Sequence, residues 1–302
     1  MRSPHPWQVG LILIIGVIAV SMAAIFIRLS LEASGQSGIG FSLFLAASRI
    51  IIAAFFLVPT WRNFSQITVT PKAYYYGISA GLALGLHFAT WITSLSFTSI
   101  VASTTLVTTN PVWVSLISWI WFQEKPSLRT IFGIIIALIG GIFIALGDTK
   151  GIPTGSNPLL GNILALVGAW MGSLYLVWGR EAQREGLRVG SYIIIAYTTA
   201  AIALFPLPLL IGSGYFGYSP RVYGYVFLMA IFSQLIGHTS LNWAVRWISP
   251  TLVTLAILFE PVGASFLGFI LFREVPSLVV ITGAIILLLG VMIAAIDSYT
   301  EG

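Results

Sequence analysis

The sequence predicts an all-α integral membrane protein in which ten transmembrane helices form two inverted five-helix repeats. Three observations lead to this fold class. The chain has few charged residues, it contains ten long apolar segments, and one pattern of motifs occurs twice, about 150 positions apart. Together they leave almost no sequence for a domain outside the membrane.

The composition and the apolar segments exclude a water-soluble fold. Only 8% of the 302 residues are charged and 58% are hydrophobic, whereas a soluble domain has about 25% charged residues. An apolar run of about 20 residues is long enough to cross a bilayer. Such runs are predicted at residues 9–29, 39–59, 73–95, 99–121, 128–147, 159–179, 190–211, 222–244, 250–272 and 277–297.

The same motifs recur in both halves of the chain. The corresponding positions are Asn110-Pro111 and Glu260-Pro261, Glu124 and Glu274, Gly133 and Gly283, Gly140 and Gly290, and His87 and His238. Because each half contains five spans, an odd number, the second half enters the membrane upside down relative to the first. The predicted domains are residues 1–147 and 159–302, joined by a linker at 148–158 that is rich in turn-forming residues.

The positive charges indicate how the chain is oriented. With the N-terminus in the cytoplasm, nine lysines and arginines fall in cytoplasmic loops and four in outer loops, as the positive-inside rule requires. We therefore expect both termini in the cytoplasm. This asymmetry explains the net charge of +5, which gives no reason to expect nucleic acid as a partner.

The order of these motifs resembles the drug/metabolite transporter superfamily, in particular its bacterial ten-helix EamA-type members. The motifs are Trp170-x-Gly172-Ser173 to Arg180, the weaker counterpart Ser21 to Arg28, Pro111 and Glu260-Pro261, and Glu124 and Glu274 thirteen residues after each proline. The resemblance covers residues 9–297, although Asn110 stands where the second half has Glu260. It implies a carrier in the bacterial inner membrane that exports amino acids, amino-acid-like metabolites or amphipathic drugs.

Glu260 and Arg49 are the charged residues that lie deepest within predicted spans. A charge at the bilayer centre costs about 2.5–3.5 kcal/mol on insertion scales, so it usually faces the bundle interior and finds a partner. Glu260 is expected either to bind a cation, a substrate ammonium group or a proton, or to form a structural ion pair, for example with Arg49. Arg49 is expected to be structural or to set the electrostatics of a cavity.

Pro111 and Pro261 lie at equivalent depths in the two halves. A proline lacks the backbone N–H and so interrupts the hydrogen bonds of a helix. Two prolines at matching positions predict paired hinges or broken helices that line a pathway for the solute.

Polar and aromatic side chains within the spans indicate a cavity for a small molecule. Gln234, His238 and Asn242 recur at helical spacing, and lipid would exclude such a polar stripe. The expected binding residues are His87, Trp91, Thr108, Asn110, Trp113, Trp170, Tyr175, His238, Asn242 and Glu260. For the histidines, a hydrogen bond between helices is the alternative. The residues expected in gates, turns or anchors are Arg28, Glu124, Arg180 and Glu274.

A secondary transporter is therefore the leading hypothesis, either as a monomer or as a homodimer. Its expected partners are a small-molecule substrate, the lipid bilayer and, as a coupling ion, the proton. The alternative within the superfamily is a carrier of sugar phosphates or nucleotide sugars, although a polyanion would need more buried cations than Arg49. An enzyme is not expected, because the chain lacks a His-Glu-x-x-His zinc motif and any cysteine. We expect no metal site and no cofactor.

Overall fold

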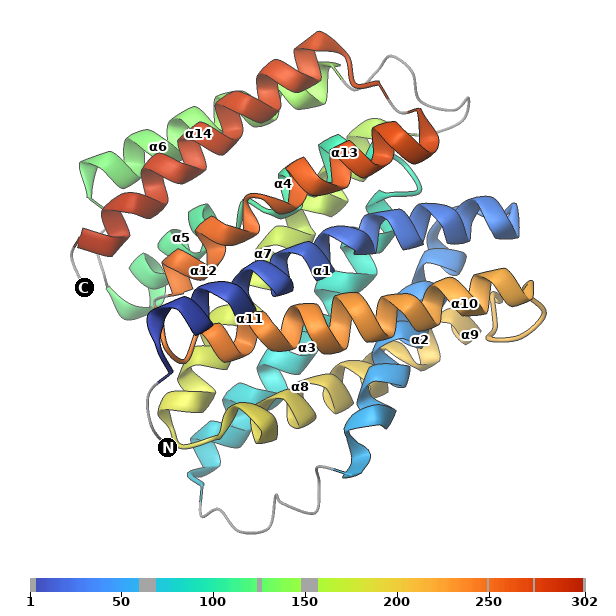
Figure 1. Ribbon diagram of the computed structural model, residues 1–302, viewed down its shortest axis with the longest axis horizontal. Coiled ribbons are helices and arrows are strands. Elements are labelled where there is room, and N and C mark those ends of the chain that lie inside the picture. Colours follow the sequence, from blue (N-terminus) through green and yellow to red (C-terminus); the bar gives the residue numbers. More distant parts are fainter. Residues whose placement is uncertain are drawn as a thin grey trace.

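The computed structural model describes residues 4–59, 69–123, 127–147, 157–248, 250–273 and 275–300. Every regular element in these ranges is a helix (Figure 1). In chain order they are α1 (Pro6–Ser34), α2 (Ile39–Leu57), α3 (Pro71–Ser94), α4 (Ile100–Val107), α5 (Asn110–Phe122), α6 (Leu128–Gly147), α7 (Pro158–Arg184), α8 (Val189–Leu204), α9 (Pro206–Leu210), α10 (Pro220–Leu228), the π-helix η2 (Met229–His238), α11 (Thr239–Ala244), α12 (Pro250–Ile257), α13 (Glu260–Phe272) and α14 (Leu278–Thr300).

The helices have the length and composition of membrane spans. Six described helical segments are long and apolar enough to cross a bilayer, and they are Pro6–Ser34, Ile39–Leu57, Ile100–Trp121, Pro158–Arg184, Val189–Leu210 and Pro220–Ala244. Shorter apolar helices occupy Leu128–Ile144, Glu260–Phe272 and Leu278–Ile293. The prediction of an all-helical membrane protein is confirmed, and described helices fall within each of the ten predicted segments.

Two spans are broken in the middle. Helix α4 ends at Val107 and α5 begins at Asn110, while α12 ends at Ile257 and α13 begins at Glu260. In each case a proline, Pro111 or Pro261, is the second residue of the following helix. Proline is tolerated in the first turn, because the N–H that it lacks would have no helical partner there. Both prolines are buried in the protein rather than exposed on its surface.

The central helices form two groups that each combine elements from both halves of the chain. Helix α1 packs against η2, α10, α11, α12 and α13, and we call this set the α1 group. Helix α7 packs against α3, α4 and α5, and we call this set the α7 group. The α2–α8 pair lies on one side of these groups and the α6–α14 pair on the other (Figure 1).

Helices α6 and α14 approach each other closely through glycines. A Cβ atom placed at Gly140 would lie 2.6 Å from the carbonyl oxygen of Gly283, and one placed at Gly290 would lie 2.6 Å from that of Gly133. These contacts pair an earlier residue on one helix with a later residue on the other, so the helices run antiparallel. Each contact is also the counterpart of the other under the 150-residue offset. An approximate two-fold axis between the two helices therefore relates α6 to α14.

We expect alanine at Gly140 or at Gly290 to separate these helices. The new Cβ atom would lie 2.3 Å from the backbone nitrogen of Leu287 in the first case, and 2.4 Å from that of Ala137 in the second. Backbone atoms cannot rotate away, and overpacking costs about 1–3 kcal/mol, so each variant should lower the thermal unfolding midpoint by roughly 3–10 °C.

The neighbouring Gly141 provides the control for this measurement, because a Cβ atom there would meet no heavy atom closer than 3.9 Å. Differential scanning fluorimetry of the purified protein should show a near-normal midpoint for Gly141→Ala. Equal losses in all three variants would show that the close approach of α6 and α14 does not limit stability.

Candidate functional site

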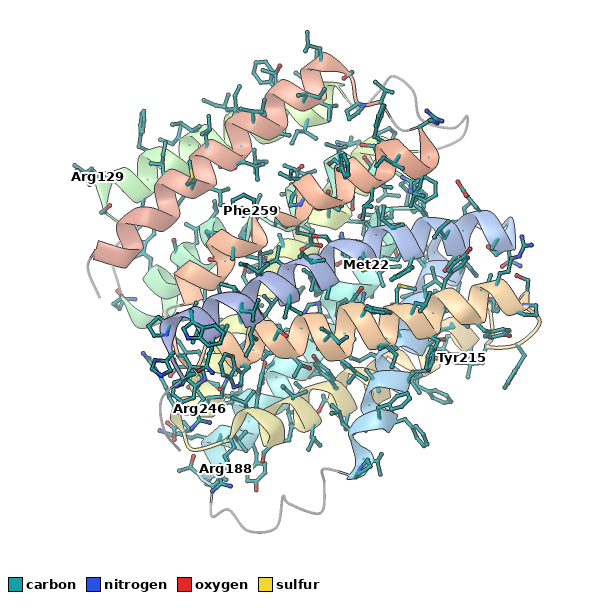
Figure 2. All side chains as sticks on the ribbon, viewed as in Figure 1. Met22, Arg129, Arg188, Tyr215, Arg246 and Phe259 are labelled. Carbon is teal, nitrogen blue, oxygen red and sulfur yellow. The ribbon has the colours of Figure 1, made fainter. Side chains whose placement is uncertain are left out.

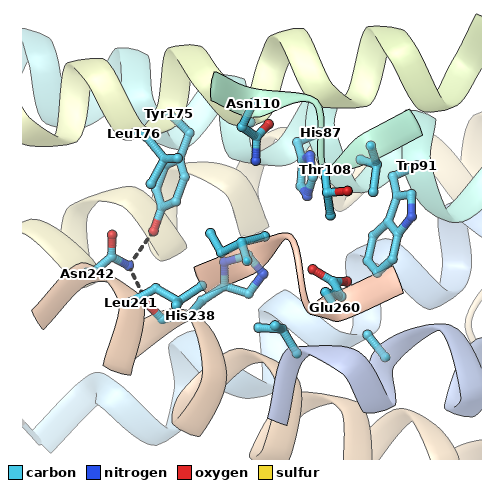
Figure 3. Close-up of a pocket in the computed structure, with 15 residues that line it drawn as sticks. His87, Trp91, Thr108, Asn110, Tyr175, Leu176, His238, Leu241, Asn242 and Glu260 are labelled. Carbon is cyan, nitrogen blue, oxygen red and sulfur yellow. Dashed lines mark hydrogen bonds between the residues drawn. The ribbon is translucent and has the colours of Figure 1, made fainter. Parts of the chain in front are cut away.

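A buried cavity lies where the two broken spans meet, between the α1 group and the α7 group (Figure 3). Its volume is about 50 Å³, which leaves room for a few water molecules, since each needs roughly 10–15 Å³. We call it the chamber. It is lined by Val20, Ala23, His87, Trp91, Val107, Thr108, Asn110, Gly172, Tyr175, Leu176, His238, Leu241, Asn242, Ile257 and Glu260.

Most of the residues that line the chamber occur in pairs that occupy equivalent positions in the two halves. The pairs are Val20 and Gly172, Ala23 and Tyr175, His87 and His238, Trp91 and Asn242, Val107 and Ile257, and Asn110 and Glu260, at offsets of 150 to 152 residues. Each half thus contributes the same positions to one shared space. The chemistry differs within the pairs, however, because one half supplies a carboxylate where the other supplies an amide.

Asn110 and Glu260 each occupy the first position of the helix that follows a break. The amide oxygen of Asn110 accepts a hydrogen bond of 3.3 Å from Ser173 Oγ on α7, and its amide nitrogen points into the chamber (Figure 3). The Glu260 carboxylate also points into the chamber (Figure 3) and makes no hydrogen bond or ion pair within the described residues. A carboxylate at a helix N-terminus is favoured by the helix dipole. The backbone position of Glu260 at the start of α13 is fixed by the helix, while the carboxylate oxygens stay available.

Arg49 does not form the ion pair with Glu260 that the sequence suggested. Its side chain is fully buried, and Nη2 donates a hydrogen bond of 2.9 Å to Oε1 of Gln234. The guanidinium carbon lies 4.1 Å from the ring centre of Phe88. Gln234 therefore does not lie on one helix face with His238 and Asn242, as the sequence predicted. The reason is that the segment that carries Gln234 is a π-helix rather than the expected α-helix.

The two histidines have different surroundings. Nδ1 of His87 lies 2.8 Å from the carbonyl oxygen of Gly168, so this ring joins α3 to α7 by a hydrogen bond. It also stacks on Trp91 with ring centres 5.8 Å apart. The ring of His238 meets the ring of Phe88 edge-on at 5.3 Å. His87 thus forms the hydrogen bond between helices that was the alternative to a binding role. The rings of His87 and His238 both line the chamber.

Asn242 and Tyr175 connect the two groups of helices beside the chamber. The Asn242 amide nitrogen donates to the Tyr175 hydroxyl at 2.5 Å and to the carbonyl oxygen of His238 at 2.8 Å. The first of these bonds crosses from α11 in the α1 group to α7 in the α7 group (Figure 3). A change in the relative position of the groups would break it.

Trp113 and Trp170 do not line the chamber, in contrast to the expectation from sequence. Trp170 is 45% exposed. It lies two positions from Gly172, and since each helical residue turns by about 100°, position 170 faces the opposite side of α7 from the chamber-lining position 172. The Trp113 indole donates to Thr109 Oγ1 at 3.0 Å and packs against Trp170 with ring centres 6.5 Å apart. These two indoles lie behind the wall of the chamber.

The residues expected in gates are only partly described. Nη2 of Arg28 donates to the carbonyl oxygen of Thr98 at 2.5 Å, which joins the α1 group to the segment between α3 and α4. Nε of Arg180 pairs with Glu181 on its own helix at 3.0 Å. Glu124 and Glu274 lie outside the described residues.

Sequence reasoning missed the apolar part of the chamber wall, which consists of Val20, Ala23, Val107, Gly172, Leu176, Leu241 and Ile257. Aliphatic residues of this kind fill every span, so composition cannot distinguish them. Pairing across the repeat was the signal that could have found five of them, but Leu176 and Leu241 belong to none of the pairs. In the described part of the chain, no group of three or more histidine or acidic side chains could hold a metal ion.

An all-helical membrane protein in which two broken spans meet at an internal chamber with several polar groups has the architecture of a membrane transporter. Comparison with known proteins agrees with this class. The chain belongs to the EamA-like transporter family, whose model matches it twice, over residues 7–146 and 159–296. This confirms the resemblance that the motifs indicated.

Individual relatives are similar to the chain at low identity. An uncharacterized transporter of Archaeoglobus fulgidus is 21% identical over 270 residues, which cover 88% of this chain and 90% of that protein. The uncharacterized transporter YyaM of Bacillus subtilis is 25% identical over 220 residues, or 68% of each chain. One solved crystal structure superposes with a TM-score of 0.63 at 16% identity, covering 99% of this chain and 100% of the other. That likeness concerns the fold alone.

Proposed function

We propose that the protein carries small neutral, zwitterionic or cationic metabolites out of the cell by alternating access, across the inner membrane of a bacterium. Amino acids, amino-acid-like compounds and amphipathic drugs are the expected classes. The observation that carries the proposal is the chamber itself, because both halves build it from equivalent positions and it contains one carboxylate.

Alternating access follows from two inverted five-helix repeats of ten spans. The reciprocal glycine contacts of α6 and α14 support this arrangement, and so does the exchange of helices between halves in the α1 and α7 groups. In such a pair of repeats, the halves can exchange conformations and open the chamber first to one side and then to the other. A chamber of about 50 Å³ must widen before it admits a metabolite, which fits a carrier whose chamber changes size between its conformations.

The charges of the chamber wall favour the proposed solutes. Glu260 is a carboxylate, and no lysine or arginine is among the lining residues. The indole of Trp91 and the phenol of Tyr175 add aromatic surface suited to cations and to amphipathic compounds. A sugar phosphate or a nucleotide sugar would bring two or more negative charges beside Glu260, and the buried cation near it, Arg49, does not line the chamber. This wall therefore disfavours the polyanionic alternative.

The distribution of basic residues supports cytoplasmic termini. Arg129, Arg188 and Arg246 lie toward the end of the bundle where α1 begins, whereas Tyr215 lies at the opposite end (Figure 2). Under the positive-inside rule, the end that carries more lysines and arginines, nine against four by sequence, faces the cytoplasm. The proton is the proposed coupling ion, because it can bind the same carboxylate as a cationic group of the solute.

Replacing Glu260 by glutamine tests this function directly. Liposomes that contain the purified protein and an amino-acid mixture should lose solute faster than protein-free liposomes, and the rate should depend on the pH gradient. A hydrogen bond to a charged group contributes about 1.5–3 kcal/mol, so Glu260→Gln should slow the efflux by roughly 10- to 100-fold and abolish its dependence on pH.

Glu32→Gln is the matched control, because Glu32 is exposed at the end of α1. It should transport like the unaltered protein. If Glu260→Gln and Glu32→Gln behave alike, the carboxylate in the chamber has no part in transport.

A further inference from the structure

Arg49 and Gln234 form a polar cluster that is separate from the chamber and fully buried. The guanidinium group has only N–H donors, so the amide oxygen of Gln234 must face it, as the bond of 2.9 Å from Nη2 requires. The amide nitrogen of Gln234 then points elsewhere and has no partner. Nε and Nη1 of Arg49 also lack partners. Every unsatisfied atom of this pair is therefore an N–H donor, and the neighbouring hydroxyl of Tyr197 is the acceptor that lies beside Gln234.

Within the described part of the chain, Arg49 has no carboxylate in direct contact, although Glu260 lies close enough to interact with it electrostatically. The other close contact of Arg49 is the face of Phe88, at 4.1 Å from the ring centre, and a ring can offset only part of the cost of burying a cation. Excess N–H donors around a buried cation that forms no direct ion pair are the chemistry of an anion site.

A single aromatic ring, that of Phe88, lies between the cluster and the wall of the chamber. Phe88 has the guanidinium of Arg49 over its face, while its ring also meets that of His238, which lines the chamber. Gln234 and His238 belong to the same π-helix, and the Tyr197 hydroxyl donates to the backbone carbonyl of Gln234 at 3.3 Å. π-Helical turns occur often at functional sites. A displacement of the Phe88 ring would connect the cluster with the chamber.

We propose that Arg49 and Gln234 bind one singly charged anion through the free N–H groups of their side chains. The same chemistry fits two sources, namely chloride from solution or the carboxylate group of a transported solute. The second source rests on the proposed function, whereas the first does not require transport at all.

Thermal unfolding of the purified protein in different sodium salts tests this site. The salts are chloride, acetate and isethionate at equal sodium concentration, with isethionate as the bulky reference anion. A ligand that binds the folded state raises the unfolding midpoint, and we expect a saturable rise of about 3–6 °C with the anion that fits. A rise with chloride assigns the site to the free halide, and a rise with acetate alone assigns it to a carboxylate.

Three variants decide whether the effect comes from this cluster. Arg49→Met and Gln234→Met remove the guanidinium and the amide with little change in volume, and both should abolish the rise. Arg221→Met replaces an exposed arginine at the start of α10, and this variant should show the same rise in the unfolding midpoint as the unaltered protein. A rise that persists in the two cluster variants, or the absence of a rise in the unaltered protein with either anion, would overturn the proposal.

Crystals soaked in bromide give a readout that needs no variant. An anomalous peak within hydrogen-bonding distance of Nε or Nη1 of Arg49 is expected if the site takes a halide. The outcome is independent of the flux assay. A protein that is stabilised by chloride but carries no solute would refute the transport function alone, and one that carries solute without any anion effect would refute this site alone.

Discussion

Moving the carboxylate from position 260 to position 110 is expected to restore transport that Glu260→Asn removes. Asn110 and Glu260 are the first residues of α5 and α13, they line the same chamber, and they occupy equivalent positions in the two halves. The exchanged protein, Asn110→Glu with Glu260→Asn, keeps one carboxylate and one amide facing the same space. Glu260→Asn alone should lower the flux roughly 10- to 100-fold, and we expect the exchanged protein to return to at least about half of the normal flux.

The measurement is efflux of the same solute mixture from liposomes that contain each protein in equal amount. Asn110→Glu alone is an informative companion, because it places two carboxylates in one chamber. Like charges in a confined apolar site repel each other unless a cation lies between them, so this variant should favour solutes with two positive charges. If the exchanged protein remains as inactive as Glu260→Asn, the two positions are not equivalent in function.

Gly172→Val is expected to stop transport while the protein still folds. Gly172 lines the chamber, and a Cβ atom at this position would lie 3.0 Å from Nδ1 of His87 and 3.5 Å from Oδ1 of Asn110. The remaining atoms of valine would fill a space that holds only a few water molecules. Val20, the equivalent residue of the other half, already lines the same chamber with a valine side chain. We expect flux to fall by at least about tenfold, which corresponds to roughly 1.4 kcal/mol.

Gly190→Val is the control, since a Cβ atom at this glycine on α8 meets no atom within 4 Å. Both variants should elute as single species in size-exclusion chromatography, with only Gly172→Val inactive in liposomes. Normal flux through Gly172→Val would mean that the solute passes elsewhere.

The sequence was sufficient to predict the helices and the places where two of them break. Helices are predictable because a bilayer admits only long apolar segments with internally satisfied backbone groups. The breaks are predictable because Pro111 and Pro261 lack an N–H in the middle of a span. The repeat also predicted that Asn110, Glu260, His87 and His238 belong together, and the structure brings all four to the chamber.

Other features depend on side-chain direction, which the sequence does not specify. Trp170 and Tyr175 lie on one helix with similar chemistry, yet Trp170 projects outward and Tyr175 inward. The π-helix at Met229–His238 has no sequence signal of its own, and it turns Gln234 toward Arg49 instead of the chamber. The sequence shows which single polar residues lie within spans, but it does not show which side chains they contact.

Access to the chamber from both faces of the membrane tests the central claim most directly. The chain contains no cysteine, so Leu176→Cys places a single thiol in the chamber and Trp170→Cys places one on the outer side of the same helix. Each is exposed to a membrane-impermeant thiol reagent, once in intact cells and once in inverted membrane vesicles. Alternating access predicts that the thiol at position 176 reacts in both preparations and the thiol at position 170 in neither. Reaction at position 176 from one face only, or from neither face, would contradict a carrier that opens in turn to each side.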